Sequence, residues 1–461
     1  MTADDKGLGL SGADARQAAR FNEIVIDSLD YRASAFPELE ALCDEAPEFA
    51  MSHLLKGYLL VGMGKKEMLP AARSCADRAS ALEETMNSRE KLHLKALRGW
   101  IAKNPDEALH SWDEILAAYP QDILALKFQH FMLFWFGRVS EMKRACENSL
   151  MSWDSSIPGY SHVLGMYSFA LEEAGDYRNA EKSGRLAVEL HSDDLWAIHA
   201  VAHVYEMQGD LKAGLNWLNQ PLSKWADRSL LKDHLWWHTA LFAFERGEYA
   251  KVLELYDAAV WPEESDFYLD TQNAASLLAR LEFAGVDVGN RWEPLAIVSE
   301  GRAGDHVHLF TEPHYAMAFG RTDRNDHSLR HLESLKAFAK GEGRYQSRPV
   351  ERVAVPVCEA VRDFYRGDYA STVDAMLPLR KEFQCIGGSH AQRDVFEIYL
   401  LEAAIRKNDL RLALSLLEER TSSRKNSVST WRKYSEVCER LGDQFGVASA
   451  EKHIGRIALA A

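Results

Sequence analysis

Two histidine pairs are the residues of this sequence best suited to do chemistry. His199 and His203 are four positions apart, and so are His234 and His238. At about 100° per residue of an α-helix, this spacing puts the two imidazoles of a pair on one face, one turn above the other. Glu206 falls on the same face as the first pair, seven residues after His199. Each pair is therefore a candidate for shared chemistry.

Three interpretations of these residues are open. Two imidazoles at this spacing with a carboxylate can hold Zn²⁺ or another divalent ion with a position open for water. The predicted ligands are then His199, His203, Glu206 and His234, which are also the predicted catalytic residues of an enzyme. Without a metal, the same side chains can hydrogen-bond a small polar molecule or a peptide. In the third interpretation, neighbouring helices and aromatic side chains satisfy the histidines within the core.

A recurring phrase indicates the elements that must position these side chains. It is a Gly, a polar residue, an aromatic or aliphatic residue, and a small or β-branched residue three positions later. Clear copies begin at Gly175, Gly209, Gly247 and Gly367, and weaker copies at Gly137, Asn408 and Gly442. Several intervals are 34 or 38 residues, which is the period of helical hairpins. We expect the Gly to end the first helix in a left-handed conformation and the acid after it to cap the second.

The segment LEEAGDYRNAEKSGRLAVEL (171–190) resembles the turn and second helix of the tetratricopeptide repeat (TPR). Further stretches resemble the tetratricopeptide repeat protein 38 family: DILALKFQH (122–130), WAIHAVAHVYEMQGD (196–210), FERGEYAKVLELYD (244–257) and GGSHAQRDVF (387–396). The resemblance covers roughly residues 20–420. It implies a solenoid of helical hairpins and says little about activity, because that family is known mainly by its fold.

The repeat model brings the two histidine pairs together. They are 35 residues apart, about one repeat, so each pair lies on the first helix of one of two neighbouring hairpins. In such a solenoid the first helices line the inner, concave surface at interaxial distances of ~8–10 Å. The resemblance implies that His199, His203 and Glu206 face this groove, that His234 and Trp237 do so too, and that His238 lies at the edge of the stripe.

The predicted fold is all-α: an α-α superhelix, a TPR-like solenoid of helical hairpins with an irregular middle that curls the array toward closure. The phrase is missing for 120 residues between Gly247 and Gly367, where turn-forming clusters interrupt the periodic stretches. We expect five regions: a flexible N-terminus (1–15), an N-terminal helical cap (16–100), regular repeats (101–260), irregular hairpins with long loops (261–350) and C-terminal repeats (351–461).

Further side chains are candidates for ligand binding. The predicted ligand-binding residues are Trp237, His238, His306, His314, His390 and Arg393. His314 follows Pro313, which favours the first turn of a helix, so this histidine can simply begin a helix. CIGGSHAQRD (385–394) can supply a nucleophile, Cys385 or Ser389, beside His390. The alternative for that segment is a capped helix start held by an Arg393–Asp394 hydrogen-bond network.

Charge and cysteine usage restrict the predicted partners. The 461 residues include 54 Lys and Arg against 69 Asp and Glu, a net charge of −15. A surface of that sign repels phosphate backbones and anionic lipids, so we exclude nucleic acid and membranes as partners. Six scattered cysteines and an N-terminus without an apolar core indicate a reducing compartment and no signal peptide. The apolar runs are short of the ~18–20 residues that cross a bilayer, and we expect a cytoplasmic protein.

Two functions follow as hypotheses. In the first, this repeat protein binds a peptide or a small polar molecule in a groove lined by His, Glu and aromatic side chains, and it can also associate with copies of itself. In the second, the same histidines form an enzyme that performs a hydrolytic or acid–base step, with or without a divalent cofactor such as Zn²⁺. Fold alone does not decide between them, so whether the protein is an enzyme stays open.

Overall fold

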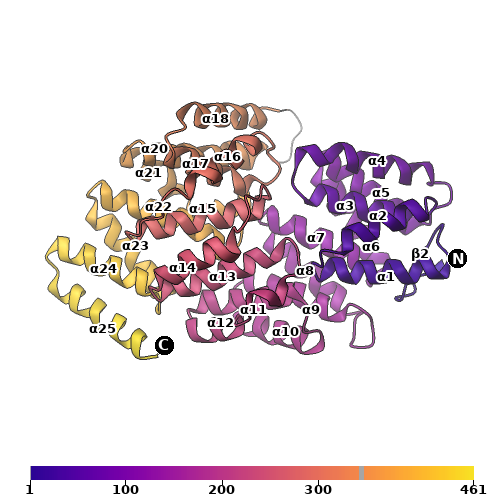
Figure 1. Cartoon of the computed structure of the whole chain (residues 1–461), viewed down its shortest axis with the longest axis horizontal. Helices are drawn as coiled ribbons and strands as arrows, with labels where there is room; N and C mark the ends of the chain where they lie inside the picture. Colours follow the sequence, from indigo (N-terminus) through magenta and orange to yellow (C-terminus); the bar gives the residue numbers. More distant parts are fainter. Residues whose placement is uncertain (1, 342–346, 461) are drawn as a thin grey trace. The chain divides into compact units, whose positions relative to one another are not determined.

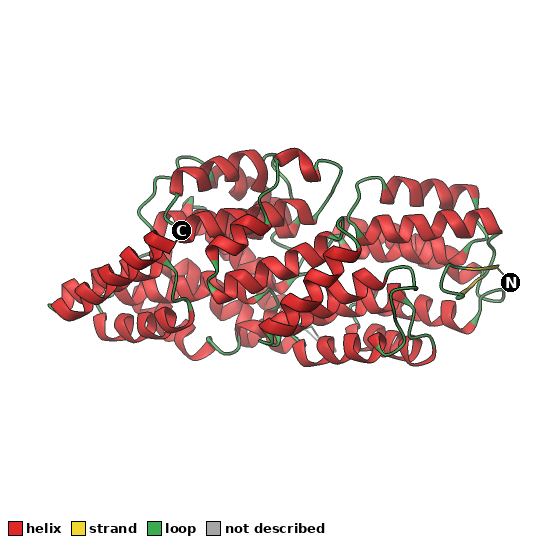
Figure 2. Ribbon diagram, turned by 90° about the horizontal axis from the view of Figure 1, so that it is seen from below, coloured by secondary structure: helices red, strands yellow, loops and turns green. Residues whose placement is uncertain are grey.

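The computed structural model describes residues 2–341 and 347–460. Residues 342–346 of the predicted irregular region, together with 1 and 461, lie outside this description. Figure 2 shows helices joined by loops, with one short pair of strands near the N-terminus. The predicted all-α superhelix of hairpins is confirmed. The described chain forms two compact units: unit 1 (2–201 and 223–232) and unit 2 (202–222, 233–341 and 347–460).

Unit 1 begins with a small antiparallel hairpin, β1 (Thr2–Ala3) and β2 (Gly9–Leu10), before its helices start (Figure 1). Its helices are α1 (Ala15–Leu29), α2 (Ala35–Glu45), α3 (Ala50–Gly62), α4 (Leu69–Ala81), α5 (Ser88–Ile101), α6 (Pro105–Ala118), α7 (Ile123–Trp135), α8 (Val139–Leu150), α9 (Tyr160–Glu173), α10 (Tyr177–Leu190) and the first half of α11 (Leu195–Gln208), with short 3₁₀ turns at Lys66–Met68 and Leu222–Trp225.

Unit 2 begins within α11, at Ala202, and contains the remaining helices. They are α12 (Leu211–Trp217), α13 (Leu231–Glu245, from its third residue), α14 (Tyr249–Leu255), α15 (Tyr268–Phe283), α16 (Trp292–Arg302), α17 (Glu312–Arg321), α18 (Asn325–Ala339), α19 (Ser347–Pro349), α20 (Val355–Tyr365), α21 (Tyr369–Met376), α22 (His390–Arg406), α23 (Leu410–Ser423), α24 (Val428–Leu441) and α25 (Gln444–Ala460). Two π-helical segments, Tyr256–Val260 and Val350–Ala354, and 3₁₀ turns at Leu309–Thr311, Leu377–Leu379 and Phe383–Ile386 make this unit irregular.

The recurring phrase forms the turns between the helices of a hairpin. Gly175 has φ 81°, and the side chain of Asp176 accepts a hydrogen bond from the backbone N–H of Asn179, three residues into α10. The weaker copy at Asn408 adopts the same left-handed conformation with φ 65°, and Asp409 caps α23. Asn tolerates this conformation better than most other non-glycine residues, which explains why it replaces Gly there. The predicted turn chemistry is confirmed at both positions.

The two helices of a hairpin differ in burial. In unit 1, nearly every side chain of α9 is buried, from His162 to Glu173. Its partner α10 buries only a stripe of small residues, Ala180, Ser183, Gly184 and Ala187. A helix that is buried on all sides has neighbours on both faces, whereas a striped helix covers one side of the core. Helices such as α9 are therefore the inner elements, and a polar side chain on them is enclosed by protein.

Within unit 2, the chain returns on itself so that α15 and α22 pack together. The guanidinium of Arg280 on α15 donates to the backbone carbonyl of Ala391 at 3.1 Å. The amide of Gln392 on α22 donates to the side-chain oxygen of Gln272 at 3.2 Å. Helices more than a hundred residues apart in sequence thus share one polar interior. This interior holds the candidate site described below.

Residues 2–11, in the segment that the sequence analysis expects to be flexible, make the following contacts. Thr2 and Ala3 pair with Leu10 and Gly9, and the side chain of Leu10 is buried. The next residue, Ser11, donates its backbone N–H to Glu90 at 2.8 Å.

Among the described residues, the helices are too short or too polar to span a lipid bilayer.

Candidate functional site

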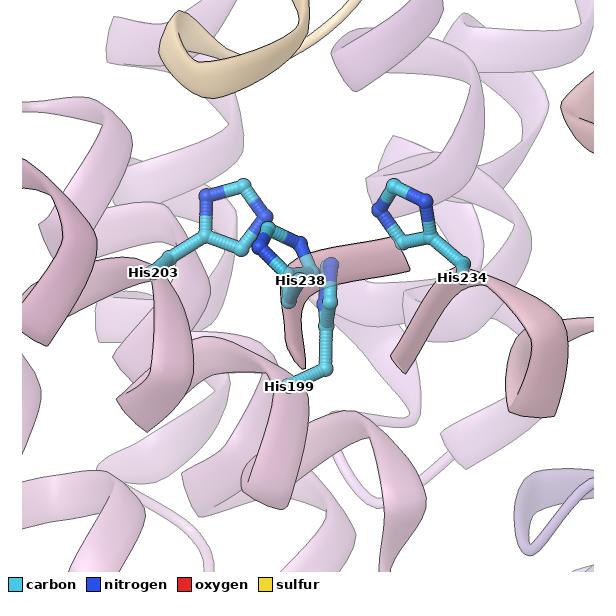
Figure 3. Close-up of side chains that lie close together, drawn as sticks. All are labelled: His199, His203, His234 and His238. Carbon is cyan, nitrogen blue, oxygen red and sulfur yellow. The ribbon is translucent and has the colours of Figure 1, made fainter. Parts of the chain in front are cut away.

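Helices α11 and α13 bring the two histidine pairs into one cluster (Figure 3). The N-terminus of α11 is capped by Asp194, whose carboxylate accepts the backbone N–H of Ala197. Each of the histidines offers a ring nitrogen, and these nitrogens lie within 4.8 Å of one another: His199, His203, His234 and His238. Three of these residues belong to unit 2, and His199 precedes His203 by one turn of the same helix.

The four side chains are enclosed, with exposed fractions of only 0 to 3%. The ring of His238 is central, 4.4 Å from the ring centroid of His203 and 4.7 Å from that of His234. Burial, reinforced by the neighbouring histidines, lowers the pKa of His203 and of His234 well below the usual range for histidine. These imidazoles are neutral at physiological pH, which is the protonation state that binds metal ions.

Hydrogen bonds determine which nitrogen of two rings carries the proton. Nδ1 of His238 lies 2.8 Å from a carboxylate oxygen of Glu206, and Nδ1 of His234 lies 2.8 Å from the amide oxygen of Asn273 on α15. Both oxygens can only accept, so each Nδ1 carries the hydrogen in the neutral ring. The Nε2 of His234 and of His238 then presents a lone pair. This arrangement is characteristic of histidines that ligate metal ions.

The wall beside the cluster is made of Trp237 and residues of α15. The indole of Trp237 stacks on the His234 ring at 5.0 Å with 12° between the planes, and its N–H donates to Ser276 at 3.1 Å. The buried guanidinium of Arg280 lies 5.8 Å from the Trp237 ring. Arg280 is also 3.7 Å from the carboxylate of Asp394 on α22. The site therefore has an aromatic wall, and behind it lies a carboxylate that Arg280 shares with Arg420 and Arg424.

The composition of the cluster differs from the predicted metal set in one residue. The sequence places His199, His203, Glu206 and His234 together and leaves His238 at the edge. In the structure His238 is a member, and Glu206 accepts a hydrogen bond from it. The carboxylate stands behind one of the candidate ligands, so its predicted role as a direct ligand is replaced by that of a hydrogen-bond acceptor.

The histidines of the second patch serve other contacts. His306 lies between Glu312, at 3.1 Å from Nδ1, and Ser334, at 2.8 Å from Nε2. His314 donates from Nδ1 to the carbonyl of Phe310 at 2.8 Å, within the first turn of α17. The prediction that His314 begins a helix is confirmed. Among the described side chains, neither histidine joins the four-histidine cluster.

The CIGGSHAQRD segment forms the capped start of α22, as predicted for its structural alternative. Ser389 and Gln392 form a reciprocal capping box, so the Ser389 hydroxyl accepts a backbone N–H. Burial raises the pKa of the Cys385 thiol, which opposes a nucleophilic thiolate. Arg393 donates to the Gly388 carbonyl, and Asp394 pairs with Arg420 at 2.6 and 2.8 Å. His390 and Arg393 both lie near enough to His203 to lower its pKa.

Sequence reasoning misses Asn273, which orients His234 from a helix 39 residues away. An asparagine inside a helical stretch carries no spacing signal that would connect it to a histidine of another repeat. The irregular middle makes this harder, because α15 follows a π-helical segment and a loop rather than a regular turn. The position of α15 opposite α13 depends on tertiary packing and not on a local sequence pattern.

Comparisons with known proteins give likeness to helical proteins at low identity. A scan of family models gives no match to this chain. A human IFIT1 dimer with m7Gppp-AAAA is 13% identical, with 97% of this chain and 96% of that chain covered and a TM-score of 0.42. A human IFIT1 dimer with PPP-AAAA has the same identity and coverage and a TM-score of 0.41. A structure of Naa15/Naa10 bound to HypK-THB is 13% identical, with 96% and 76% covered and a TM-score of 0.24.

The prediction that nucleic acid is excluded as a partner is wrong, because it is drawn from the charge of the whole chain. The IFIT1 structures, for their part, contain capped or triphosphate RNA. The physical reason is that net charge sums the entire surface, whereas an anionic ligand responds to the local field of the cleft that holds it. A net charge of −15 does not decide this class of partner.

Proposed function

We propose that this TPR-like repeat protein binds a divalent transition-metal ion in unit 2, with Zn²⁺ the favoured ion. The ligands are the imidazoles of His203, His234 and His238, which all belong to unit 2. The observation that carries the proposal is the pair of oriented rings: His238 donates to Glu206 and His234 donates to Asn273. Both Nε2 atoms are therefore held as lone-pair donors before any ion arrives.

The donor chemistry favours a borderline-soft ion. Imidazole nitrogens suit Zn²⁺, Cu²⁺ and Ni²⁺ better than Mg²⁺ or Ca²⁺, which prefer oxygen. A tetrahedral Zn²⁺ with Zn–N distances of about 2.0–2.1 Å requires nitrogens about 3.3 Å apart. The nitrogens lie within 4.8 Å of one another, so side-chain movements on the order of 1 Å bring them to the separation that the ion requires. Low pKa values of His203 and His234 mean that protons compete weakly with the metal.

The enclosure of the cluster favours a metal ion over a peptide as its ligand. A groove that binds a peptide needs exposed side chains, but these four are at most 3% exposed. Hydrolysis also needs a substrate that reaches the ion, and the three imidazoles of unit 2, His203, His234 and His238, are enclosed by protein. We therefore favour a metal-binding role over hydrolysis at this cluster.

We also infer membership of the tetratricopeptide repeat protein 38 family. The segments that carry the resemblance coincide with elements of the fold: WAIHAVAHVYEMQGD (196–210) forms most of α11, and FERGEYAKVLELYD (244–257) forms the turn between α13 and α14. The first segment contains His199 and His203. Of the proposed metal ligands, His203 thus belongs to the part of the sequence that supports the family inference.

The test is metal stoichiometry in untagged protein. The full chain is stripped with EDTA, reloaded with Zn²⁺, freed of excess ion by gel filtration and measured by elemental analysis. We expect His203→Ala and His234→Ala each to lose one equivalent that the wild type holds. His327→Ala, a half-buried histidine on α18, is the matched control and should lose none. Circular dichroism and thermal melts identify variants that fail to fold, and Glu206→Gln supplies a milder change. Retention of the full wild-type stoichiometry in both folded alanine variants would refute the proposal.

A further inference from the structure

A second group of metal-ligating side chains lies in unit 1, where the ends of three helices meet. Asp30 follows the last residue of α1, His162 lies on α9 and His191 follows α10. One carboxylate oxygen of Asp30 is 2.9 Å from Nε2 of His162 and 2.8 Å from Nε2 of His191. The ring centroids of the two histidines are 5.1 Å apart. Two imidazoles and one carboxylate therefore converge on a single point.

The carboxylate of Asp30 is buried and is held by hydrogen bonds from both imidazoles. Arg32 lies 4.0 Å from its second oxygen, yet that guanidinium also pairs at 2.8 Å with Asp193 and with Asp227. The carboxylate is thus directed mainly at the two imidazoles.

Asp194 is a second, independent observation beside these three residues. Its side chain is fully buried, and one oxygen accepts the backbone N–H of Ala197. The other oxygen has no hydrogen-bond partner among the described residues. The charges of His162 and His191 act on this carboxylate, and the carboxylate in turn acts on the buried ammonium of Lys127 on α7, which donates to the hydroxyl of Tyr31. A buried carboxylate with an unsatisfied oxygen is costly unless a cation compensates it.

We propose that Asp30, His162 and His191 form a divalent transition-metal site of the two-histidine, one-carboxylate type, with Asp194 as the additional anion that balances the ion's charge. When the ion binds, each neutral ring carries its proton on Nδ1 instead of Nε2, so that the Nε2 lone pair faces the ion and the carboxylate oxygen bonds the ion in place of two N–H groups. This donor set suits Zn²⁺, Mn²⁺ or Fe²⁺ and leaves coordination positions for water. His191 is 32% exposed, so the ion can enter from solvent at that ring.

A purely structural hydrogen-bonded triad is the competing explanation. It accounts for the contacts of Asp30 with the two histidines, which are complete without an ion. It does not account for the buried Asp194 oxygen, since both imidazoles already point at Asp30. A doubly charged ion compensates both carboxylates at once. A metal ion therefore explains the Asp194 oxygen as well, which the hydrogen-bonded triad leaves unexplained.

The test uses Zn²⁺ and the full chain, with stoichiometry measured as for the cluster in unit 2. If both sites bind, the wild type holds two equivalents. His191→Ala is the principal variant, because this partly exposed ring follows the end of a helix and its loss spares the core. We expect it to lose one equivalent, or to bind that equivalent at least tenfold more weakly. His110→Ala, an exposed histidine on α6 that pairs with a glutamate, is the control in the same unit and should lose none.

The outcomes separate the two sites. If the wild type holds one equivalent and only His203→Ala or His234→Ala removes it, the site in unit 1 is refuted and the one in unit 2 stands. If only His191→Ala removes it, the reverse holds. Asp30→Asn keeps the size of the side chain and tests the carboxylate, so retention of full stoichiometry in both His191→Ala and Asp30→Asn overturns this inference. A His203→Ala variant that still loads unit 1 shows that the two sites are independent.

Discussion

Replacing Glu206 by glutamine tests the site in unit 2 without removing a ligand. The carboxylate of Glu206 accepts the Nδ1 hydrogen of His238 at 2.8 Å, and both side chains are buried. A metal ion on Nε2 withdraws charge from the ring, which strengthens the Nδ1–H as a donor. A negatively charged acceptor therefore stabilises the metal-bound ring more than the neutral ring. Glutamine keeps the length of the side chain and an acceptor oxygen but removes the charge.

The expected size of the effect follows from the change in hydrogen-bond type. A buried hydrogen bond to a charged group contributes about 1.5–3 kcal/mol, and a neutral one about 0.5–1.5 kcal/mol. The difference of about 1–1.5 kcal/mol corresponds to roughly a tenfold weaker Zn²⁺ affinity. This is the lower end of the 10–100-fold losses typical of residues that orient metal ligands, about what an isosteric change should give.

The assay is a Zn²⁺ titration in competition with a chelator of known affinity, on EDTA-stripped wild type and Glu206→Gln. Glu248→Gln is the matched control, because this glutamate is exposed at the start of α14 and pairs with Arg246. Urea unfolding of the metal-free proteins measures the structural effect separately. A Zn²⁺ affinity of Glu206→Gln within twofold of the wild type, in a folded protein, would contradict the assignment of Glu206 as the residue that orients His238.

Three further predictions concern stability. Asp394→Asn breaks the two-pronged pair with Arg420 and leaves a buried guanidinium uncompensated, so urea unfolding should show a loss of ~3–5 kcal/mol. Burial would raise the pKa of Glu312, but hydrogen bonds from two histidines outweigh burial and lower the pKa to about 2. The ionised carboxylate therefore contributes ~3 kcal/mol to the free energy of unfolding. This contribution is complete above pH ~4.5 and disappears as the pH falls toward 2. Glu312→Gln should remove that part of the acid dependence in a pH series of unfolding curves; an unchanged slope would contradict it. Gly214→Ala puts a Cβ 2.3 Å from a buried phenylalanine ring and should cost ~1–3 kcal/mol, whereas Gly301→Ala, in open space within α16, should be neutral or stabilising in thermal melts.

The regular part of the fold is predictable because its turns are local. A Gly or Asn that must adopt positive φ, followed by an acid that caps the next helix, lies within a few residues of sequence, as at Gly175 and Asn408. The packing of α15 against α22 has no such signal. It depends on contacts such as the one between Gln272 and Gln392, 120 residues apart, which emerge only when the irregular hairpins are folded.

The candidate site shows the same division. The two histidine pairs follow from helical spacing and the repeat period, because both rules hold within neighbouring hairpins. The role of Glu206 cannot be predicted from spacing and repeat period. It depends on the rotation of α13 against α11, which determines whether the carboxylate contacts an ion or the ring of His238. The group at Asp30 is still harder to predict from the sequence, because its histidines are 132 and 161 residues away.

The polar residues inside unit 2 argue that the cluster has been kept for a function. Inner helices of a solenoid pack well with apolar side chains, and replacing a buried polar network by such side chains is often neutral or stabilising. Here the inner helices instead carry His203, His234, Asn273 and Arg280 at buried positions. Neutral imidazoles add little to stability that leucine would not add. Their convergence, with Glu206 and Asn273 setting the proton positions, brings nitrogen donors together, and a metal ion is the ligand that this arrangement fits.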